Sequence, residues 1–162
     1  MDIAFHGLAG LALSKALTGE YLPSAALFSM LPDLGAVPHF YHSVKNSSKI
    51  SLKHFTGDYM GINYRGKFLS DFDRNIYWST HSLFSLIPVS LIAFFIFGNI
   101  WWILSLSYLS HLIIDAFTHE HEASFHPLWP LSDWSISGKS YSSNKNVLFL
   151  SWFTLLVILL LQ

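Results

Sequence analysis

The sequence predicts an all-α integral membrane protein, a bundle of about five helices that forms one domain over residues 1–162. Three observations lead to this fold class. Hydrophobic residues make up 52% of the chain and charged residues only 12%, roughly half the share in a typical soluble domain. The apolar residues form long runs, and the last run, 147–161, carries no charge. Aromatic pairs at the ends of runs, Tyr77–Trp78 and Trp101–Trp102, are typical of membrane interfaces, although a soluble helical protein with a very apolar core is the alternative.

The first two expected helices lie close to the N-terminus. Residues 3–17 are apolar, and the small residues Gly7, Gly10 and Ser14 would let a second helix approach closely, as in many membrane helix pairs. A polar turn then leads to a helix at 23–31, which starts with a proline and stops near the next one. At a rise of about 1.5 Å per residue, this short helix crosses only half of a hydrocarbon core that is ~30 Å thick.

Three more helices are expected, at 80–97, 100–117 and 147–161. Pro88 should bend the first of them, and a Gly-Asn pair separates it from the second. The helices leave two polar connections, 33–79 and 118–146. Part of the first connection, 50–68, is expected to form a small hairpin.

Counting membrane crossings places both polar connections on one side of the bilayer. The N-terminus lies on that side, the helix at 3–17 leaves it, and each later helix reverses direction. Five residues with metal-ligand side chains then fall at a similar depth, although they come from four different helices. They are His6, Asp33, His81, His111 and Asp115. The sequence therefore predicts one polar site near this end of the bundle.

The distribution of positive charge indicates which side this is. Eight of the nine lysine and arginine residues lie in or beside the two polar connections: Lys45, Lys49, Lys53, Arg65, Lys67, Arg74, Lys139 and Lys145. An excess of positive residues in short loops marks the cytoplasmic face. We therefore expect a multi-pass protein of the cell inner (plasma) membrane, with its N-terminus and its site on the cytoplasmic side.

His111 and Asp115 carry the clearest chemical signal. They are four residues apart, so both project from one face of the helix at 100–117. An unpaired aspartate in the bilayer costs about 2.5–3.5 kcal/mol or more, and a divalent cation would offset this cost. The simpler alternative is a neutral histidine that holds two helices together through a hydrogen bond to the carboxylate. Because the chain has no cysteine, only nitrogen and oxygen ligands exist, which suit Zn²⁺, with Mn²⁺ or Fe²⁺ fitting nearly as well.

The second polar connection is rich in histidine and supplies further candidates. His126 is a candidate for an additional metal ligand, and His119 and Glu120 are candidates for proton transfer in catalysis. Hydrated loop residues are the simpler interpretation of all three. Trp129 and Trp134 are expected to anchor the loop at the membrane interface. Three other histidines, His39, His42 and His54, are expected at the surface.

Short motifs occur in an order that resembles a known family. His6, "LPD" (31–33), "THS" (80–82), "HLIID" (111–115) and "HPLWPLS" (126–132) together resemble the predicted membrane-bound metal-dependent hydrolases, called domain of unknown function 457. The resemblance covers nearly the whole chain. That family is thought to be distantly related to zinc-dependent phospholipase C, so the resemblance implies hydrolysis of a phosphate ester.

The chain departs from the pattern of that family at two places. The family often has a second aspartate where this sequence has Gly35, and "HRG" where it has Ile76, Tyr77 and Trp78. The resemblance then implies fewer metal ions, ligands supplied by the histidine-rich loop, or loss of activity.

The function that we expect is a membrane-bound, metal-dependent hydrolase of a phosphate ester, such as a phospholipid or a lipid-linked phosphate. A divalent-metal transporter or a metal-sensing membrane protein would use the same ligands without hydrolysis, and bound ions could also act only as structural staples. The expected partners are membrane lipid and the ester substrate. A net charge of −1 gives no reason to expect nucleic acid, and the oligomeric state is left open.

Overall fold

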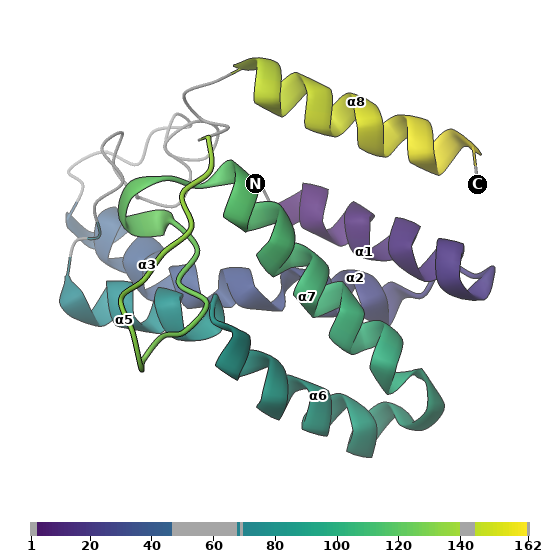
Figure 1. The fold of residues 1–162 in the computed structure, drawn as a ribbon, viewed down its shortest axis with the longest axis horizontal. Coiled ribbons are helices and arrows are strands. Elements are labelled where there is room, and N and C mark those ends of the chain that lie inside the picture. Colours follow the sequence, from purple (N-terminus) through teal and green to yellow (C-terminus); the bar gives the residue numbers. More distant parts are fainter. Residues whose placement is uncertain (1–2, 47–67, 69, 140–144, 162) are drawn as a thin grey trace.

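The computed structural model describes residues 3–46, 68, 70–139 and 145–161, which form a helical protein (Figure 1). Its elements are α1 (Ile3–Thr18), α2 (Pro23–Met30), the 3-10 helix η1 (Leu31–Ala36), α3 (Val37–Asn46), α5 (Asp71–Thr80), α6 (Leu83–Phe97), η2 (Gly98–Ile100), α7 (Trp101–Thr118), η3 (His121–Ala123) and α8 (Lys145–Leu161). Within these residues, extended pairing is limited to one antiparallel bridge between Phe125 and Ile136. The prediction of an all-α fold is therefore confirmed for the part of the chain that the structure describes.

The five expected helices are present as α1, α2, α6, α7 and α8. The first polar connection differs from our expectation, because it contains the helices α3 and α5. The Ser70 hydroxyl caps α5 by accepting the backbone N–H of Asp73, and Asp71 also favours this helix N-terminus. These capping signals were present in the sequence, but we predicted a connection without helices because the segment is polar. The hairpin expected at 50–68 lies almost wholly outside the described residues.

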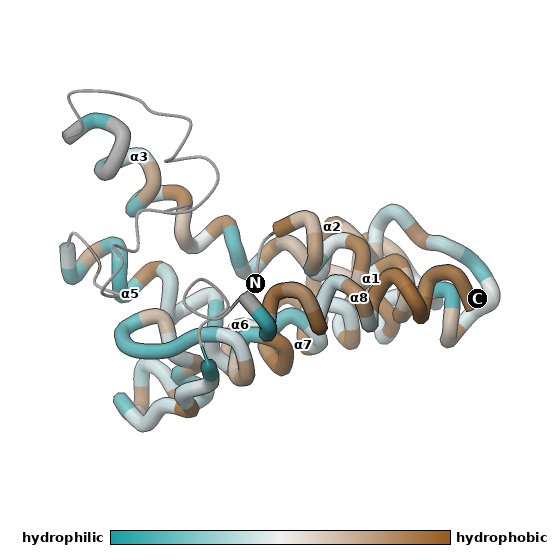
Figure 2. Tube along the Cα trace, turned by 90° about the horizontal axis from the view of Figure 1, so that it is seen from above, coloured by the Kyte–Doolittle hydropathy of each residue, from teal (hydrophilic) through white to brown (hydrophobic). Residues whose placement is uncertain are grey.

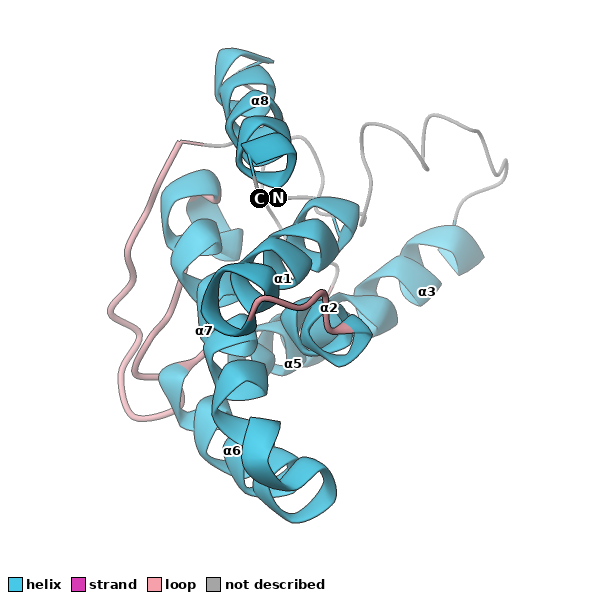
Figure 3. Ribbon diagram, turned by 90° about the vertical axis from the view of Figure 1, so that its right-hand side faces the viewer, coloured by secondary structure: helices cyan, strands magenta, loops and turns pink. Residues whose placement is uncertain are grey.

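The long helices extend along the long axis of the molecule. Following the chain, α1, α6 and α8 run in one direction, and α2 and α7 run in the other (Figure 1). Viewed from one end, α8 stands on the side of α1, and α6 lies on the opposite side beyond α7 (Figure 3). The helices α3 and α5 gather with the segment after α7 at the end where α1 begins (Figure 1). These directions are the reversals from which we predicted a single polar end.

Small residues bring α1 and α2 into close contact, as the sequence predicts. A side-chain carbon added at Gly10 would lie 2.5 Å from the carbonyl oxygen of Ala25 and 2.8 Å from Cβ of Ser29. Gly7 instead faces the sulfur of Met30 in α2, the far end of a flexible side chain. Because only glycine permits the close approach of two backbones at position 10, Gly10 sets the distance between the two helices. His6 is thereby held beside the last turn of α2.

Apolar residues cover much of the helices away from the α3–α5 end, where polar residues are concentrated (Figure 2). One helical run, Leu83–Thr118, is long and apolar enough to cross a membrane, and α1 and Leu148–Leu161 are shorter apolar helices. The run is a hairpin, because Gly98, with φ of +55°, ends α6 and α7 returns beside it. The outward side chains of α6 include Phe95, which is 79% exposed. Such a surface is suited to contact with lipid.

The two aromatic pairs lie in different surroundings. Trp101 and Trp102, at the start of α7, are partly exposed, in agreement with an interfacial position. Tyr77 and Trp78 are instead buried in α5, where they pack with Ala36 of η1. The interfacial interpretation of the second pair was wrong, because the sequence gave no indication that α5 folds back onto η1.

Candidate metal centre

Four segments of the chain bring histidine and aspartate side chains to one point near the α3–α5 end. The set, which we call the central cluster, consists of His6, Asp33, His81, His111 and Asp115. Two subsets have ligand atoms that all lie within 4.8 Å of one another, namely His6 with His111 and Asp115, and Asp33 with His81 and His111. All five side chains are buried. The structure therefore brings together every residue that the counting of crossings placed at this depth.

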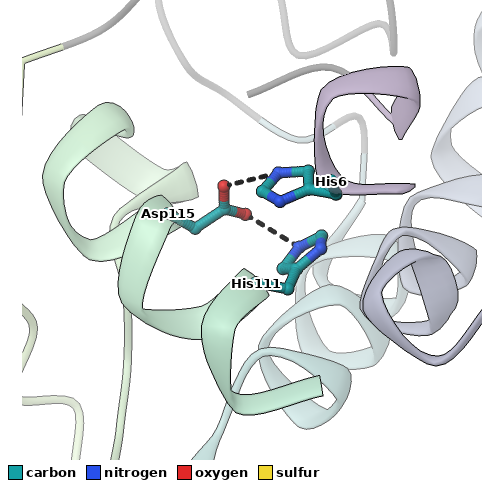
Figure 4. Close-up of side chains that lie close together, drawn as sticks. All are labelled: His6, His111 and Asp115. Atoms are coloured by element: carbon teal, nitrogen blue, oxygen red, sulfur yellow. Dashed lines mark ion pairs between the residues drawn. The ribbon is translucent and has the colours of Figure 1, made fainter. Parts of the chain in front are cut away.

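Asp115 lies in the middle of the central cluster, and its two carboxylate oxygens face different histidines. Oδ1 is 3.1 Å from Nε2 of His6 and 3.2 Å from Nδ1 of His119. Oδ2 is 3.1 Å from Nε2 of His111 and 3.4 Å from Nε2 of His81. Figure 4 shows the carboxylate reaching the ring of His6 with one oxygen and that of His111 with the other. A carboxylate in this position can bind a single ion or bridge two adjacent ions.

Backbone carbonyl groups fix the orientation of two histidine rings. Nδ1 of His111 donates to the carbonyl oxygen of Ser29 at 2.7 Å, and Nδ1 of His81 donates to that of Tyr77 at 2.9 Å. Pro32, three residues further on, has no N–H that could donate to the same Ser29 carbonyl. Since a carbonyl group only accepts, each Nδ1 carries a proton, and the lone pair of each neutral ring lies on Nε2.

Three hydrogen-bond acceptors consequently face one another: Nε2 of His81, Nε2 of His111 and Oδ2 of Asp115. The two nitrogens are only 3.2 Å apart. Acceptors at this distance repel unless a positive charge lies between them, and either a proton or a metal ion can supply that charge. Two ligand atoms on one tetrahedral zinc ion lie about 3.3–3.4 Å apart, because each metal–ligand bond is ~2.0–2.1 Å long. The observed separations of the three acceptors therefore fit a metal ion.

Burial disfavours a proton on His81 and a charge on Asp33. It lowers the pKa of His81 below the ordinary value, so this ring is neutral near pH 7. It also raises the pKa of Asp33, whose Oδ1 lies 3.8 Å from Nε2 of His111 and whose Oδ2 has no hydrogen-bond partner among the described residues. His6 is 0% exposed, and its Nδ1 has no hydrogen-bond partner within the described parts of the chain, whereas its Nε2 lies against the Asp115 carboxylate. Buried polar atoms in this situation are normally satisfied by an ion or by water.

The histidine-rich segment after α7 brings one of its candidates to the central cluster. The Nδ1 atom of His119 lies against Asp115, and burial lowers the pKa of the His119 ring. The backbone at this point is held by Gly138, whose N–H donates to the His119 carbonyl oxygen at 2.7 Å. A side chain at Gly138 would collide with the backbone of Phe117, so the close approach requires glycine. His119 is therefore held in position by the later part of its own loop, at Gly138.

The other two candidates in this segment lie further from the centre. The Glu120 side chain is 32% exposed, and its Oε1 lies 3.9 Å from Nε2 of the exposed His121. The ring of His126 stacks on Trp78 with centroids 3.9 Å apart, and its Nδ1 donates to the carbonyl oxygen of Ser124 at 2.7 Å. The structure thus places Glu120 at the edge of the site and does not bring His126 into the central cluster.

Two of the histidines that we expected at the surface form a second group with an aspartate. We call His39, His42 and Asp73 the α3–α5 cluster. His39 and Asp73 are both 0% exposed, so the surface assignment of His39 was wrong. Nδ1 of His42 lies 2.9 and 3.1 Å from the two carboxylate oxygens of Asp73, and Nδ1 of His39 lies 3.6 Å from one of them. The three-residue spacing of His39 and His42 would have indicated a shared helix face, had we predicted α3; His54 lies outside the described residues.

Gly35 and Ile76 occupy positions at which the metal-dependent hydrolase family that the sequence resembles often has further ligands. In this structure the two residues lie at the contact between η1 and α5. A side chain at Gly35 would collide with the Thr80 hydroxyl and lie 3.2 Å from the carbonyl oxygen of Ile76. The Thr80 hydroxyl also donates to the carbonyl oxygen of Pro32 at 2.9 Å, which closes the contact further. The space beside Gly35 is therefore filled by the side chain of Thr80 and the carbonyl oxygen of Ile76.

Comparison with known proteins adds an independent finding. A family model described as "YdjM inner membrane protein" matches residues 1–162. The chain belongs to the YdjM inner membrane protein family. No curated protein and no solved structure matches it. Membership in the YdjM family supports the predicted inner-membrane location and agrees with the apolar α6–α7 hairpin. It carries no statement about hydrolysis, so the chemistry has to be argued from the central cluster.

Proposed function

We propose that this YdjM family member is a membrane-bound metal-dependent hydrolase that cleaves a phosphate ester, such as a phospholipid or a lipid-linked phosphate. In this proposal the chain crosses the inner membrane several times, and the central cluster lies near the cytoplasmic surface. The side is supported by the eight lysine and arginine residues that lie in or beside the two polar connections.

The observation that carries the proposal is the convergence of Nε2 of His81, Nε2 of His111 and Oδ2 of Asp115, which lie 3.1–3.4 Å from one another. His6 and Asp33 add further nitrogen and oxygen ligands at the same place. A mixed histidine and aspartate set suits Zn²⁺, and Mn²⁺ or Fe²⁺ fit nearly as well. Ligand sets of this kind with a position left for water or substrate are typical of catalytic rather than structural sites.

A divalent cation held here would supply Lewis-acid chemistry, polarising a phosphoryl oxygen and lowering the pKa of water. The remaining tasks fall to the chain itself. Asp115 holds imidazole rings on both sides of its carboxylate and so fixes the geometry of the site. We propose His119 as the group that holds and transfers the proton, because Asp115 orients its Nδ1. Glu120, at the edge of the site, is a second candidate for that role.

The interior of the bundle favours a hydrolase over the alternative of a metal transporter. A transport path needs ligating groups that continue beyond the central cluster. There the described core is apolar, and it consists of Ala25, Phe28, Ala93, Ile103 and Leu104. The buried hydroxyl groups of Ser14 and Ser107 donate to carbonyl groups of their own helices, at 2.8 Å each. The described residues therefore offer a site at one end of the bundle and no chain of ligands through it.

The proposal is tested by metal analysis together with an ester screen. The purified protein in detergent should contain close to one or two equivalents of a divalent metal, and it should hydrolyse at least one phosphomonoester or phosphodiester of a lipid. His111→Ala and Asp115→Ala should lose both the metal and the activity, whereas His121→Ala, which changes an exposed histidine, should keep both.

Two results would overturn the proposal. Full metal content in His111→Ala and Asp115→Ala would show that the metal is bound elsewhere. Metal-dependent uptake of the ion into proteoliposomes, with no turnover of any ester, would replace the hydrolase by a transporter.

A further inference from the structure

The segment that follows the central cluster is a firmly held loop. Two hydrogen bonds between Phe125 and Ile136, at 2.8 and 3.1 Å, close its base. The backbone N–H of Leu83, the first residue of α6, donates to the carbonyl oxygen of Pro127 at 3.0 Å. Residues 127–134, which we call the apolar loop, are therefore tethered to the start of α6 (Figure 1). A loop fixed in this way cannot easily turn its side chains inward.

Despite this rigidity, the apolar loop presents large hydrophobic side chains outward. Leu131 is 78% exposed, Trp134 is 58% exposed and Leu128 is 42% exposed. Trp129 differs, since its indole packs on Trp78 with centroids 5.0 Å apart. The two tryptophans for which the sequence suggested the same interfacial role are thus separated by the fold: one braces the loop and the other projects from it. Exposed apolar area costs roughly 25 cal/mol per Å² in water, so a fixed projection of this kind needs an apolar partner.

The position of the apolar loop indicates what that partner is. Leu83, to which the loop is tethered, is 41% exposed and begins the outward apolar face of α6, where Phe84 and Ile87 are 39% and 60% exposed. This face belongs to the helical run that is long and apolar enough to cross a membrane. The loop therefore extends the lipid-facing surface of α6 towards the polar end. Asp133, which is exposed between Leu131 and Trp134, restricts the loop to the headgroup region and keeps it out of the hydrocarbon centre.

We propose that the apolar loop inserts into the headgroup region of the membrane leaflet next to the central cluster. Its partner is the lipid surface itself. The loop follows directly after His126 and is joined at its base to His119, so it fixes the depth of the site relative to the lipid phosphates. The consequence for substrates rests on the proposed hydrolase function: an ester carried by a membrane lipid would reach the site by lateral diffusion.

The absence of cysteine from the chain makes a direct test possible. Leu131→Cys is labelled with an environment-sensitive fluorophore and reconstituted into vesicles of phosphatidylethanolamine and phosphatidylglycerol. The emission should shift to the blue, and lipids that carry a quencher at a shallow acyl position should reduce it several-fold more than lipids with a deep quencher. His121→Cys, whose native histidine side chain is 62% exposed, serves as the matched control and should respond mainly to an aqueous quencher.

Equal accessibility of the two labels to the aqueous quencher, with no effect of the lipid quenchers at Leu131→Cys, would overturn the proposal. A blue shift without lipid quenching would overturn it as well, since a second protein copy would then cover the loop. Both readouts are independent of catalysis. A separate arm measures hydrolysis by Leu131→Ser/Trp134→Ser, which should lose about 10-fold on vesicle lipid and keep its rate on a short-chain ester in detergent. If the double variant kept its rate on both substrates, the loop would not help lipid esters to reach the site. If the unmodified protein hydrolysed neither substrate, the result would count against the hydrolase function but not against insertion of the loop.

Discussion

The central cluster and the α3–α5 cluster use the same residue types but are built differently. In the α3–α5 cluster, a ring nitrogen of His42 lies within hydrogen-bonding distance of both oxygens of Asp73, so donor and acceptor are matched. In the central cluster, the Nδ1 atoms of His81 and His111 are bound to backbone carbonyls, and their Nε2 atoms converge on Oδ2 of Asp115. The first arrangement pairs a histidine directly with a carboxylate, whereas the second brings together ligand atoms in a geometry that could hold a metal ion.

The backbone carbonyls behind the histidine rings cause this difference. Ser29 and Tyr77 each present a carbonyl oxygen to a histidine of the central cluster and thereby set the tautomer of its ring. His42 also remains partly in contact with solvent, with a side chain that is 38% exposed. A histidine and aspartate pair in a sequence is therefore not sufficient evidence for a metal site; the hydrogen bond on the far side of each ring decides.

The largest effect should come from the same substitution made in both clusters. Asp115→Asn keeps the shape of the side chain but removes the charge that would bind the cation. We therefore expect metal affinity to fall by more than the ~10–100-fold that is typical when a residue behind a metal ligand is changed. Asp73→Asn should leave the metal content unchanged. Elemental analysis after dialysis measures both proteins side by side. Loss of the metal from Asp73→Asn, with retention in Asp115→Asn, would reverse the roles that we assign.

Removal of the metal should destabilise the protein through the central cluster alone. A ligand present at about 100 times its dissociation constant stabilises the folded state by ~2.7 kcal/mol, which for a chain of this size corresponds to a shift in Tm of roughly 5–10 °C. We therefore expect a strong chelator to lower the Tm of the detergent-solubilised protein and of Asp73→Asn by similar amounts. Asp115→Asn should show no shift. An equal shift in all three proteins would mean that the chelator acts elsewhere.

A smaller effect should follow from a change behind the ligands. Pro32→Ala restores a backbone N–H that can compete with His111 for the carbonyl oxygen of Ser29. The ring of His111 would then be less firmly oriented, and we expect the metal affinity to fall by about 10–100-fold with the fold retained. Titration calorimetry with Zn²⁺ measures the change, and circular dichroism checks the helix content. Unchanged affinity would show that the Ser29 carbonyl does not orient His111.

The convergence of the central cluster could be predicted from the sequence because it depends on little more than helix direction. Once the apolar runs are assigned as helices, each reversal places His6, His81 and Asp115 at one end, whatever the details of packing. The i and i+4 spacing of His111 and Asp115 then fixes their common face. The helical periodicity and the number of chain reversals are thus sufficient to predict where the ligands lie. They are not sufficient to predict the tautomers of the histidine rings, which depend on carbonyl groups from other elements.

The polar regions were predicted less well, because their positions depend on contacts between segments far apart in the chain. His126 lies in a loop whose path is set by bonds to Leu83 and Ile136, and no local pattern reveals these bonds. Asp73 was not among the candidates, because its burial depends on the packing of α5 against α3. Long-range packing, which leaves no periodic signal in the sequence, determines the position of both residues.

The smallest effect should come from the α3–α5 cluster itself. Asp73→Asn weakens a buried, charge-assisted hydrogen bond to His42, so we expect the free energy of unfolding to fall by about 1–3 kcal/mol. His42→Ala should cost a similar amount. Because the two side chains act on each other, the double variant should be less destabilised than the sum of the single variants, by ~0.5–3 kcal/mol. Thermal unfolding in detergent measures all three. Strictly additive effects would show that the pair does not hold α3 to α5, and the contrast between a directly paired histidine and aspartate and a candidate metal site would lose one of its two sides.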